Sequence, residues 1–419
     1  MLKNGSSPVA VLGAGIAGVQ AALDLAQLGH RVVLLERAAR PGGKLAVLQK
    51  TFPTNDCSAC ALTPQTDFFC IRSPHFIKHA AQDKIALLTG VEVEGLSGTP
   101  GNFRLRVRRE GRQEELSLAA LILCPGFEEY LPPGLERYGY GRYPDVLTGL
   151  ELEQRLALDK RLRRPSDGRP VQRMAFIQCA GSRDLANGVA YCSAVCCMYA
   201  LKEALMCYEA AAMEDLPLPE ITLFYMDMRT YGKTYQQYLE KAQKEYGLRL
   251  VRSRIHSIIQ PPGNPKLIIR YALENGQAVV EEFDLSVLST GLRPPENLRD
   301  LAKKLEIELD SYGFCQISSL SPVSTSRPGV FVAGAFGGPC DVIDAVTQGS
   351  AAAAACSTWL KDAGLSGICN NTLELESTTL LASRDHAPRI GVFICDGEHL
   401  SGSLVLKLLE EYGSSLPDV

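Results

Sequence analysis

The chain has 419 residues and 14 cysteines, 46% of its residues are hydrophobic, and its formal net charge is −4. These values are typical of a globular protein with two or three domains and give no reason to expect a nucleic-acid partner. Because the sequence shows neither the apolar run of a signal peptide nor an apolar segment of about 20 residues that could cross a bilayer, we expect a cytoplasmic protein without a membrane span. Its thiols would stay reduced there, so the cysteines indicate metal binding, redox chemistry or burial.

A β-α-β pattern opens the chain, with the strand PVAVLGAG, a helix over residues 16–29 and the strand HRVVLLER. Gly13, Gly15 and Gly18 form a G-x-G-x-x-G motif between the first strand and the helix. Such glycines allow a tight turn, a close approach of a pyrophosphate to the helix N-terminus, and close packing of helix on sheet. Glu36, at the end of the second strand, can accept a hydrogen bond from an adenosine ribose and would repel a 2′-phosphate. The sequence therefore predicts a dinucleotide site that disfavours NADP, and the alternative is a glycine turn without a ligand.

Three later segments favour FAD over NAD at this site. RPGGK adds a glycine pair where flavoproteins of the thioredoxin-reductase type have one, and LSLAALILCPGF resembles the strand before their second FAD-contacting turn. GVFVAGAFGG resembles their C-terminal FAD motif, but Ala335 stands where that motif has Asp, so Asp341 or Asp344 would supply the carboxylate. The residues predicted to bind the cofactor are Gly13, Gly15, Gly18, Glu36, Arg37, Gly42, Gly43, Lys44, Gly126, Gly334 and Asp344.

The middle of the chain repeats the α/β pattern after a polar, basic stretch at 158–170. VQRMAFIQCAGS is a predicted strand, helices and strands alternate up to a hairpin-like pair, and residues 328–360 form a strand, a glycine turn and a long helix. We predict an α/β fold with two dinucleotide-binding-type (Rossmann-like) domains. The expected parts are a discontinuous FAD-binding domain (1–147 plus 286–360), a smaller inserted domain (148–285) that resembles an NAD(P) domain, and a C-terminal extension (361–419) that is packed on the main body or is a truncated second module.

Four cysteines crowd the inserted domain: Cys179, Cys192, Cys196 and Cys197. They stand where the glycine motif of an NAD(P)H site would be, which makes direct NADH oxidation a weaker hypothesis. Their spacing differs from that of bacterial ferredoxins and of common zinc sites. If residues 192–204 are helical, two of the thiols lie one turn apart and Cys179 approaches from the strand end. Four thiolates at a helix N-terminus favour an iron–sulfur cluster, with a tetrahedral zinc or simple buried thiols as alternatives.

At these residues the sequence resembles the A-type component of heterodisulfide reductase and its relatives. The resemblance rests on KTFPTNDCSACALTP, on CAGSRD followed by YCSAVCCMYALKEA, on FYMDMRTYGKTYQQYLEKA and on VFVAGAFGGP. It implies FAD, and a [4Fe–4S] cluster on Cys179, Cys192, Cys196 and Cys197. It also implies that electrons pass among partner subunits, in some members with bifurcation or confurcation.

Two departures from the family are visible. The ferredoxin-like insertion of the full-length family is absent, because REGRQEELSL runs straight through its place. The tail PRIGVFICDGEHLSGS resembles the family's N-terminal module, but Cys395 is followed by Asp396 and Gly397 rather than by a second cysteine of a C-x-C pair. The implied partners are heterodisulfide-reductase B- or C-like, ferredoxin-like, or hydrogenase- or dehydrogenase-like subunits, and a homodimer is possible.

Two further groups are candidates for redox chemistry. Cys57 and Cys60 form a C-x-x-C pair that could be a redox-active dithiol, ligands to a shared cluster, or thiols packed against FAD. Lys202 could approach the flavin N5 edge and tune its potential, or form a solvated helix pair with Glu203. The main hypothesis is an FAD- and [4Fe–4S]-dependent electron-transfer subunit. The alternatives are a self-contained FAD-dependent disulfide reductase that uses Cys57 and Cys60, and a non-catalytic flavin-binding scaffold.

Overall fold

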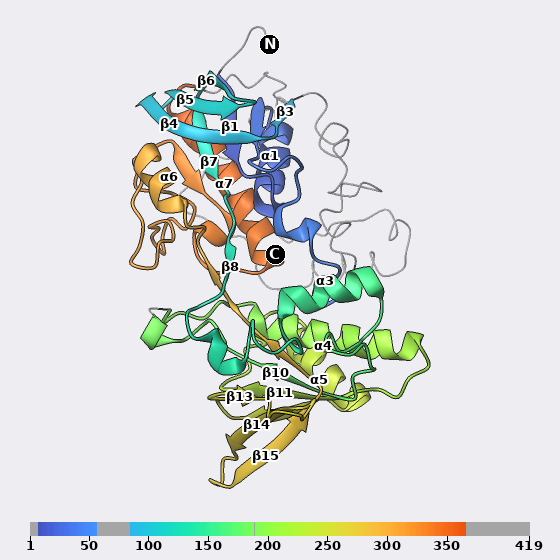
Figure 1. The fold of residues 1–419 in the computed structure, drawn as a ribbon. Coiled ribbons are helices and arrows are strands. Elements are labelled where there is room, and N and C mark those ends of the chain that lie inside the picture. The colour runs from blue at the N-terminus through green and yellow to red at the C-terminus, as the bar shows by residue number, and fades with distance from the viewer. Residues whose placement is uncertain (1–6, 57–83, 188, 366–419) are drawn as a thin grey trace, which may run out of the picture. The chain divides into compact units, whose positions relative to one another are not determined.

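The computed structural model describes residues 7–56, 84–187 and 189–365, which lie in one compact unit, Met1–Cys369. Two five-stranded parallel sheets organise this unit (Figure 1). The first sheet has the order β18-β7-β1-β2-β3. Its strands are short apolar runs with most side chains buried, as expected for a parallel sheet covered on both faces. They are β1 (Val9–Leu12), β2 (Val32–Leu35), β3 (Ile85–Leu88), β7 (Ala120–Leu123) and β18 (Val330–Val332).

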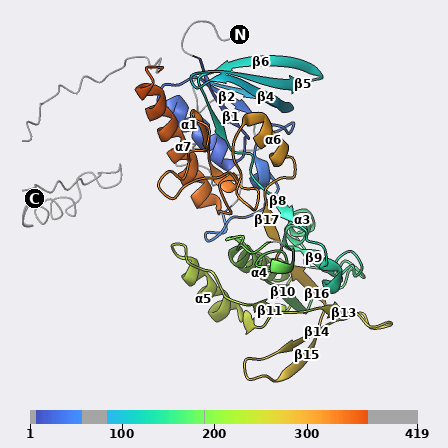
Figure 2. The ribbon, with the colours of Figure 1, turned by 90° about the vertical axis from the view of Figure 1, so that its left-hand side faces the viewer.

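Two helices cover one face of the first sheet, and an antiparallel sheet with one further helix covers the other. Helices α1 (Ile16–Gln27) and α7 (Val342–Asp362) pack on each other and on the strands through small residues, and both views show them side by side (Figures 1 and 2). The opposite face packs against α6 and the sheet β4-β5-β6. Strand β5 alternates exposed and buried side chains, as a strand with one solvated face does. The bounds are β4 (Val91–Thr99), β5 (Asn102–Arg109), β6 (Arg112–Leu118) and α6 (Leu298–Leu305).

The second parallel sheet has the order β12-β11-β10-β16-β9. Three helices bury their apolar sides on one of its faces, and an antiparallel sheet, β13-β14-β15, covers the other. The strands are β9 (Val146–Thr148), β10 (Arg173–Ile177), β11 (Glu220–Tyr225), β12 (Arg249–Arg252), β13 (Ile258–Ile259), β14 (Leu267–Ala272), β15 (Ala278–Phe283) and β16 (Leu285–Leu288). The helices are α3 (Gly149–Asp159), α4 (Cys196–Met213) and α5 (Tyr235–Tyr246).

A two-stranded antiparallel ribbon lies where the chain passes between the two sheets. Its strands are β8 (Glu128–Tyr130), which follows the first sheet's β7, and β17 (Gly291–Arg293), which follows the second sheet's β16. The predicted α/β fold is confirmed. The division into domains stays a prediction, and we propose that its edges include β9 and β16 in the inserted part, because both strands pair within the second sheet.

One expected helix starts later than the sequence suggested. Residues 192–204 were expected to be helical throughout, but α4 begins at Cys196. Ala194 has a φ of 62°, in the left-handed region, which interrupts a right-handed helix at that residue. The four residues Cys192–Val195 therefore form a turn that leads into α4, and the expected one-turn spacing of Cys192 and Cys196 on a helix face was wrong.

Candidate functional site

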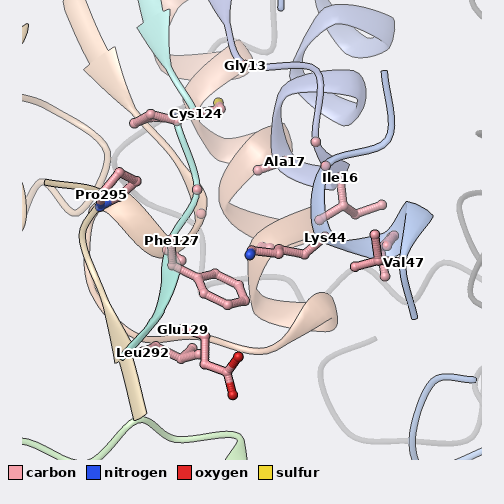
Figure 3. Close-up of a pocket in the computed structure, with 18 of the residues that line it drawn as sticks. Gly13, Ile16, Ala17, Lys44, Val47, Cys124, Phe127, Glu129, Leu292 and Pro295 are labelled. Carbon is pink, nitrogen blue, oxygen red and sulfur yellow. The ribbon is translucent and has the colours of Figure 1, made fainter. Parts of the chain in front are cut away.

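A cavity of about 840 Å³ opens at the carboxyl ends of the first sheet's strands (Figure 3). This volume lies within the range of small-molecule and cofactor sites, and the carboxyl end of a parallel sheet is where such folds bind ligands. The wall includes the β1–α1 turn, the β7–β8 connection and the N-terminal half of α4. Figure 3 shows Lys44, Phe127 and Glu129 facing the same space, with the Lys44 ammonium 5.7 Å from the centre of the Phe127 ring.

The three glycines of the first motif have separable structural roles. A Cβ at position 18 would lie 1.8 Å from the carbonyl oxygen of Gly13, and one at position 13 would lie 2.1 Å from the carbonyl oxygen of Cys124. These two glycines are therefore required where α1 passes close to the sheet. A Cβ at Gly15 would meet nothing within 4 Å, and Gly15 lines the cavity. Gly15 thus keeps a part of the cavity open that a side chain would fill.

The N-terminus of α1 and the carboxylate of Glu36 suit the two halves of an adenosine diphosphate group. Gly15 is the N-cap of α1, no side chain caps the helix, and its first turn contains no acidic residue. Its first N–H groups are therefore free of side-chain acceptors that would compete with a phosphate. The Glu36 carboxylate lines the cavity and accepts hydrogen bonds from the N–H groups of Ala14 and Ala38, both at 2.8 Å. These bonds fix the carboxylate beside the glycine turn and leave its remaining lone pairs for a ligand hydroxyl.

Most of the predicted cofactor-binding residues meet at this cavity. Those that line it are Gly13, Gly15, Glu36, Arg37, Gly43, Lys44, Gly126 and Gly334. Gly18, Gly42 and Asp344 lie outside the lining, and Asp341 takes the place expected for Asp344. Asp341 is the N-cap of α7: its side chain accepts a hydrogen bond from the Asp344 N–H at 2.9 Å and another from the Tyr235 hydroxyl.

One side of α4 forms the cavity wall next to the cysteines. Val195, Tyr199, Lys202 and Glu203, spaced as on one helix face, all line the cavity. The Tyr199 hydroxyl donates to the carbonyl oxygen of Thr290 at 2.8 Å, which ties α4 to the residue before the β17 strand. Lys202 and Glu203 are only 1% and 2% exposed, so the alternative of a solvated helix pair was wrong.

Lys202 is held in a buried ion pair that the sequence did not reveal. Its ammonium lies 2.6 Å from Oε2 of Glu153 on α3 and 3.4 Å from the carbonyl oxygen of Lys50. The second oxygen of Glu153 accepts from the N–H groups of Gln49 and Lys50 at 2.9 and 3.2 Å. The expected approach of Lys202 to a flavin stays a prediction, since its charge is already matched by Glu153.

Glu203 differs from Glu153 in having no such partner. Its Oε2 is buried without a hydrogen bond among the described residues. Burial raises the pKa of the Glu203 carboxyl well above its usual value, Lys202 opposes this rise, and Glu153 and Glu129 add to it. Glu129, Glu153 and the burial of Glu203 were missed from the sequence. The only local signal was that α4 is apolar on nearly all sides around Lys202 and Glu203.

The four predicted cluster ligands come together at the start of α4. Cys192 and Cys196 share a side-chain hydrogen bond, and the Cys179 thiol interacts electrostatically with Cys192 and Cys197. Cys196 and Cys197 are buried, and the other two are half-buried. In the described part of the chain, no group of three or more His, Cys, Asp or Glu side chains is arranged to hold a single metal ion.

Backbone geometry and nearby charge also set this loop apart. Cys179 and Ala194 have φ values of 58° and 62°, a region that costs non-glycine residues energy and is common at functional sites. The hydrogen bond from Cys196 lowers the pKa of Cys192 to about 5, and the N–H of Ala194 donates to the Cys192 sulfur at 3.4 Å. Arg183 and Arg229 favour the charged form of Cys179. The loop therefore favours thiolates, the form that binds metals.

Cys57 and Cys60 lie outside the described residues, as does the C-terminal extension beyond residue 365. Hypotheses on the C-x-x-C pair and on the extension therefore stay predictions. Among the described residues, no helix is long and apolar enough to cross a bilayer.

The family model for pyridine nucleotide-disulphide oxidoreductases matches residues 7–349. The chain belongs to this family. It is therefore an oxidoreductase by membership, and the family supports FAD as the ligand of the first site.

Curated relatives narrow the comparison. The chain is 33% identical to the second iron-sulfur A-type component of the CoB–CoM heterodisulfide reductase of Methanopyrus kandleri, over 84% of this chain and 64% of the relative. It is 31% identical to the A-type component of the H2:CoB-CoM heterodisulfide,ferredoxin reductase of Methanothermobacter marburgensis, over 82% of this chain and 62% of the relative. The resemblance to the A-type component of heterodisulfide reductase is confirmed, and the chain spans less than two thirds of the length of these relatives.

Solved structures agree on the fold. Thioredoxin reductase of T. acidophilum superposes with a TM-score of 0.53 at 18% identity, covering 85% of this chain and 98% of the other. Lactococcus lactis thioredoxin reductase gives 0.52 at 19% identity, over 85% and 99%. At such identities the likeness concerns the fold alone.

Proposed function

We propose that this chain is an FAD- and [4Fe–4S]-dependent electron-transfer subunit of a heterodisulfide-reductase-like complex, which passes electrons between partner subunits. The observation that carries the proposal is the continuity of α4. The helix begins at two of the four predicted cluster ligands, and its next two turns line the predicted flavin cavity through Tyr199, Lys202 and Glu203. The names of the relatives, one of them an iron-sulfur protein, support the same proposal.

The chain's residues fit FAD at the cavity. The open space at Gly15, the uncapped start of α1 and the fixed carboxylate of Glu36 would hold the pyrophosphate and the adenosine ribose. Because these groups lie at the β1–α1 end, the flavin ring would occupy the part of the cavity that α4 lines. Gly43 and Gly334 keep the backbone close to the ligand, since a Cβ at either would lie 3.0 or 2.9 Å from Gly15 or Ala17.

The chemistry of the four thiols suits a cluster better than one zinc ion. A tetrahedral zinc holds its sulfurs about 3.8 Å apart, because each Zn–S bond is about 2.3 Å long. A four-iron cluster holds its thiolates further apart, which agrees with four thiols that interact with one another but do not close around one ion. Arg183 and Arg229 would offset part of the negative charge that such a group brings.

Together, the flavin would exchange electrons in pairs and the cluster singly. The protein's own residues would bind the two groups at opposite ends of the same helix segment, keep water from the ring through the buried α4 face, and hold a fixed charge pair, Lys202 with Glu153, in the wall. We infer that the donor and the acceptor are partner proteins, because the described part of the second sheet lacks the glycine motif of an NAD(P)H site, with Cys179, Ala180 and Gly181 in its place.

Cysteine substitutions on α4 test this proposal with a matched control. Cys196→Ala removes a predicted ligand, whereas Cys207→Ala removes a fully buried thiol of the same helix that is not one of the four. After anaerobic purification and reduction, we expect the cluster signal in electron paramagnetic resonance from the wild type and from C207A, and its loss or conversion in C196A with FAD retained. Equal iron in C196A and C207A, or none in the wild type, would contradict the cluster assignment.

A further inference from the structure

The part of the cavity that would hold the flavin ring contains a carboxyl group without a partner. Glu203 is 2% exposed, lines the cavity, and has a buried Oε2 that forms no hydrogen bond with any described residue. Nine-tenths or more of such a side chain is out of water, where an isolated carboxylate is unstable. A group with these properties either takes up a proton or finds a partner that the protein alone does not supply.

The charges that face Glu203 do not favour its ionised form. Lys202, its neighbour on α4, is already paired with Glu153 of α3 at 2.6 Å. Glu129 of β8 faces the same cavity and has Oε1 bound to the Thr290 hydroxyl at 2.6 Å. Both carboxylates disfavour a third negative charge beside them.

The start of α3 is the one structural feature that could stabilise a carboxylate here. The Glu203 carboxyl oxygens lie close to Gly149, the first residue of α3, since a Cβ there would be 2.8 Å from Oε2. No described N–H group donates to Oε2, however, and the α3 terminus already has a capping box. In it, Thr148 Oγ1 accepts from the Glu151 N–H at 3.3 Å, and Glu151 Oε2 accepts from the Thr148 N–H at 2.8 Å. The terminus therefore does not replace the missing partner.

We propose that Glu203 is a neutral carboxylic acid that donates a hydrogen bond to the ring end of the flavin. The proposal rests on the proposed function, because it assigns the ring of FAD to the α4 side of the cavity. A protonated carboxyl offers one O–H donor, and the ring carries nitrogen and carbonyl acceptors along one edge. Lys202 would then be a positioning residue for α3, while Glu203 touches the ligand.

Infrared spectroscopy of the full chain tests the protonation state directly. The wild type at neutral pH should show the carbonyl stretch of a buried carboxylic acid, shifted in D2O, and Glu203→Gln should remove it. Glu240→Gln is the matched control, because Glu240 is an exposed helical carboxylate paired with Lys244 at 3.1 Å. The control should keep the band. A band that persists unchanged in E203Q overturns the proposal.

The affinity for FAD tests the hydrogen bond. Glu203→Leu should weaken FAD binding about tenfold, and Glu203→Gln, which keeps a donor of similar size, should stay within about threefold of the wild type. As the pH rises and Glu203 ionises, the donor is lost and the wild-type affinity should fall more steeply than that of E203Q. Equal pH profiles for the two proteins overturn the proposal even if E203L fails to fold.

The two proposals fail in different ways. A wild type and an E240Q variant that bind no FAD contradict the proposed function. A chain that binds FAD but shows no acid band attributable to Glu203 contradicts only the assignment of Glu203.

Discussion

Alanine substitutions at two glycines of the first motif should have opposite effects on the fold and on the ligand. Gly15 and Gly18 are three residues apart at the start of α1, yet a Cβ at Gly15 would meet nothing within 4 Å, whereas one at Gly18 would lie 1.8 Å from a backbone oxygen. The same chemical change therefore tests the cavity at one position and helix packing at the other.

The structure gives a magnitude for each change. Gly15 has φ −79° and ψ −173°, which alanine adopts without strain, so Gly15→Ala should stabilise the FAD-free chain by about 0.4–1 kcal/mol through the unfolded state. Gly18→Ala gains about 1 kcal/mol of helix propensity but must separate two backbone segments from 1.8 Å to ordinary contact. Overpacking of this kind costs about 1–3 kcal/mol or more, and because neither neighbour is a flexible side chain we expect a net loss of about 2 kcal/mol.

Urea unfolding of the FAD-free chains and fluorescence titration with FAD measure the two effects separately. G15A should unfold at a higher urea concentration than the wild type and bind FAD more than tenfold more weakly, a loss of about 1.4 kcal/mol, because its methyl group enters the cavity. G18A should unfold at a lower concentration. The reasoning is refuted if G15A binds FAD as tightly as the wild type, or if it is destabilised as much as G18A.

Two further predictions concern the charges of the second sheet and its helices. Glu153→Gln leaves the Lys202 ammonium buried without a counter-charge and should cost about 3–5 kcal/mol in chemical unfolding, and adding Lys202→Met should recover part of that loss; two small and additive effects would mean that the pair behaves as an exposed one. Although burial raises it, the ion pair with Lys266 and two backbone N–H groups hold the pKa of Asp284 below its usual value. Its stabilisation is therefore present above the unfolded value of 3.8 and is lost as the pH falls through the lower folded value. Melting curves should accordingly show Asp284→Asn less stable than the wild type at neutral pH and the difference shrinking in acid, and a difference that grows in acid would contradict this sign.

The sequence predicted the first site well because its signals are local. The turn from β1 to α1 needs glycine at positions where a Cβ would meet backbone atoms, and such requirements are written in three residues. The strands of both sheets are uninterrupted apolar runs, which made the α/β fold recognisable. Glu36 could be found because it ends a strand at a fixed point of the motif.

Features that depend on tertiary packing could not be predicted. The partner of Lys202 is Glu153, which belongs to another helix, and nothing near either residue indicates the other. The choice between Asp341 and Asp344 depended on which one caps α7, a matter of a single backbone conformation. The start of α4 was misplaced because Ala194 adopts a left-handed conformation that alanine rarely takes.

The central claim is that one chain holds a flavin and an iron–sulfur cluster at the two ends of the same helix segment. Iron, acid-labile sulfide and FAD can be counted in the full chain purified without oxygen. The account predicts about four iron and four sulfide atoms for each bound FAD. A chain that binds FAD but holds no iron, with Cys179, Cys192, Cys196 and Cys197 intact, would contradict it.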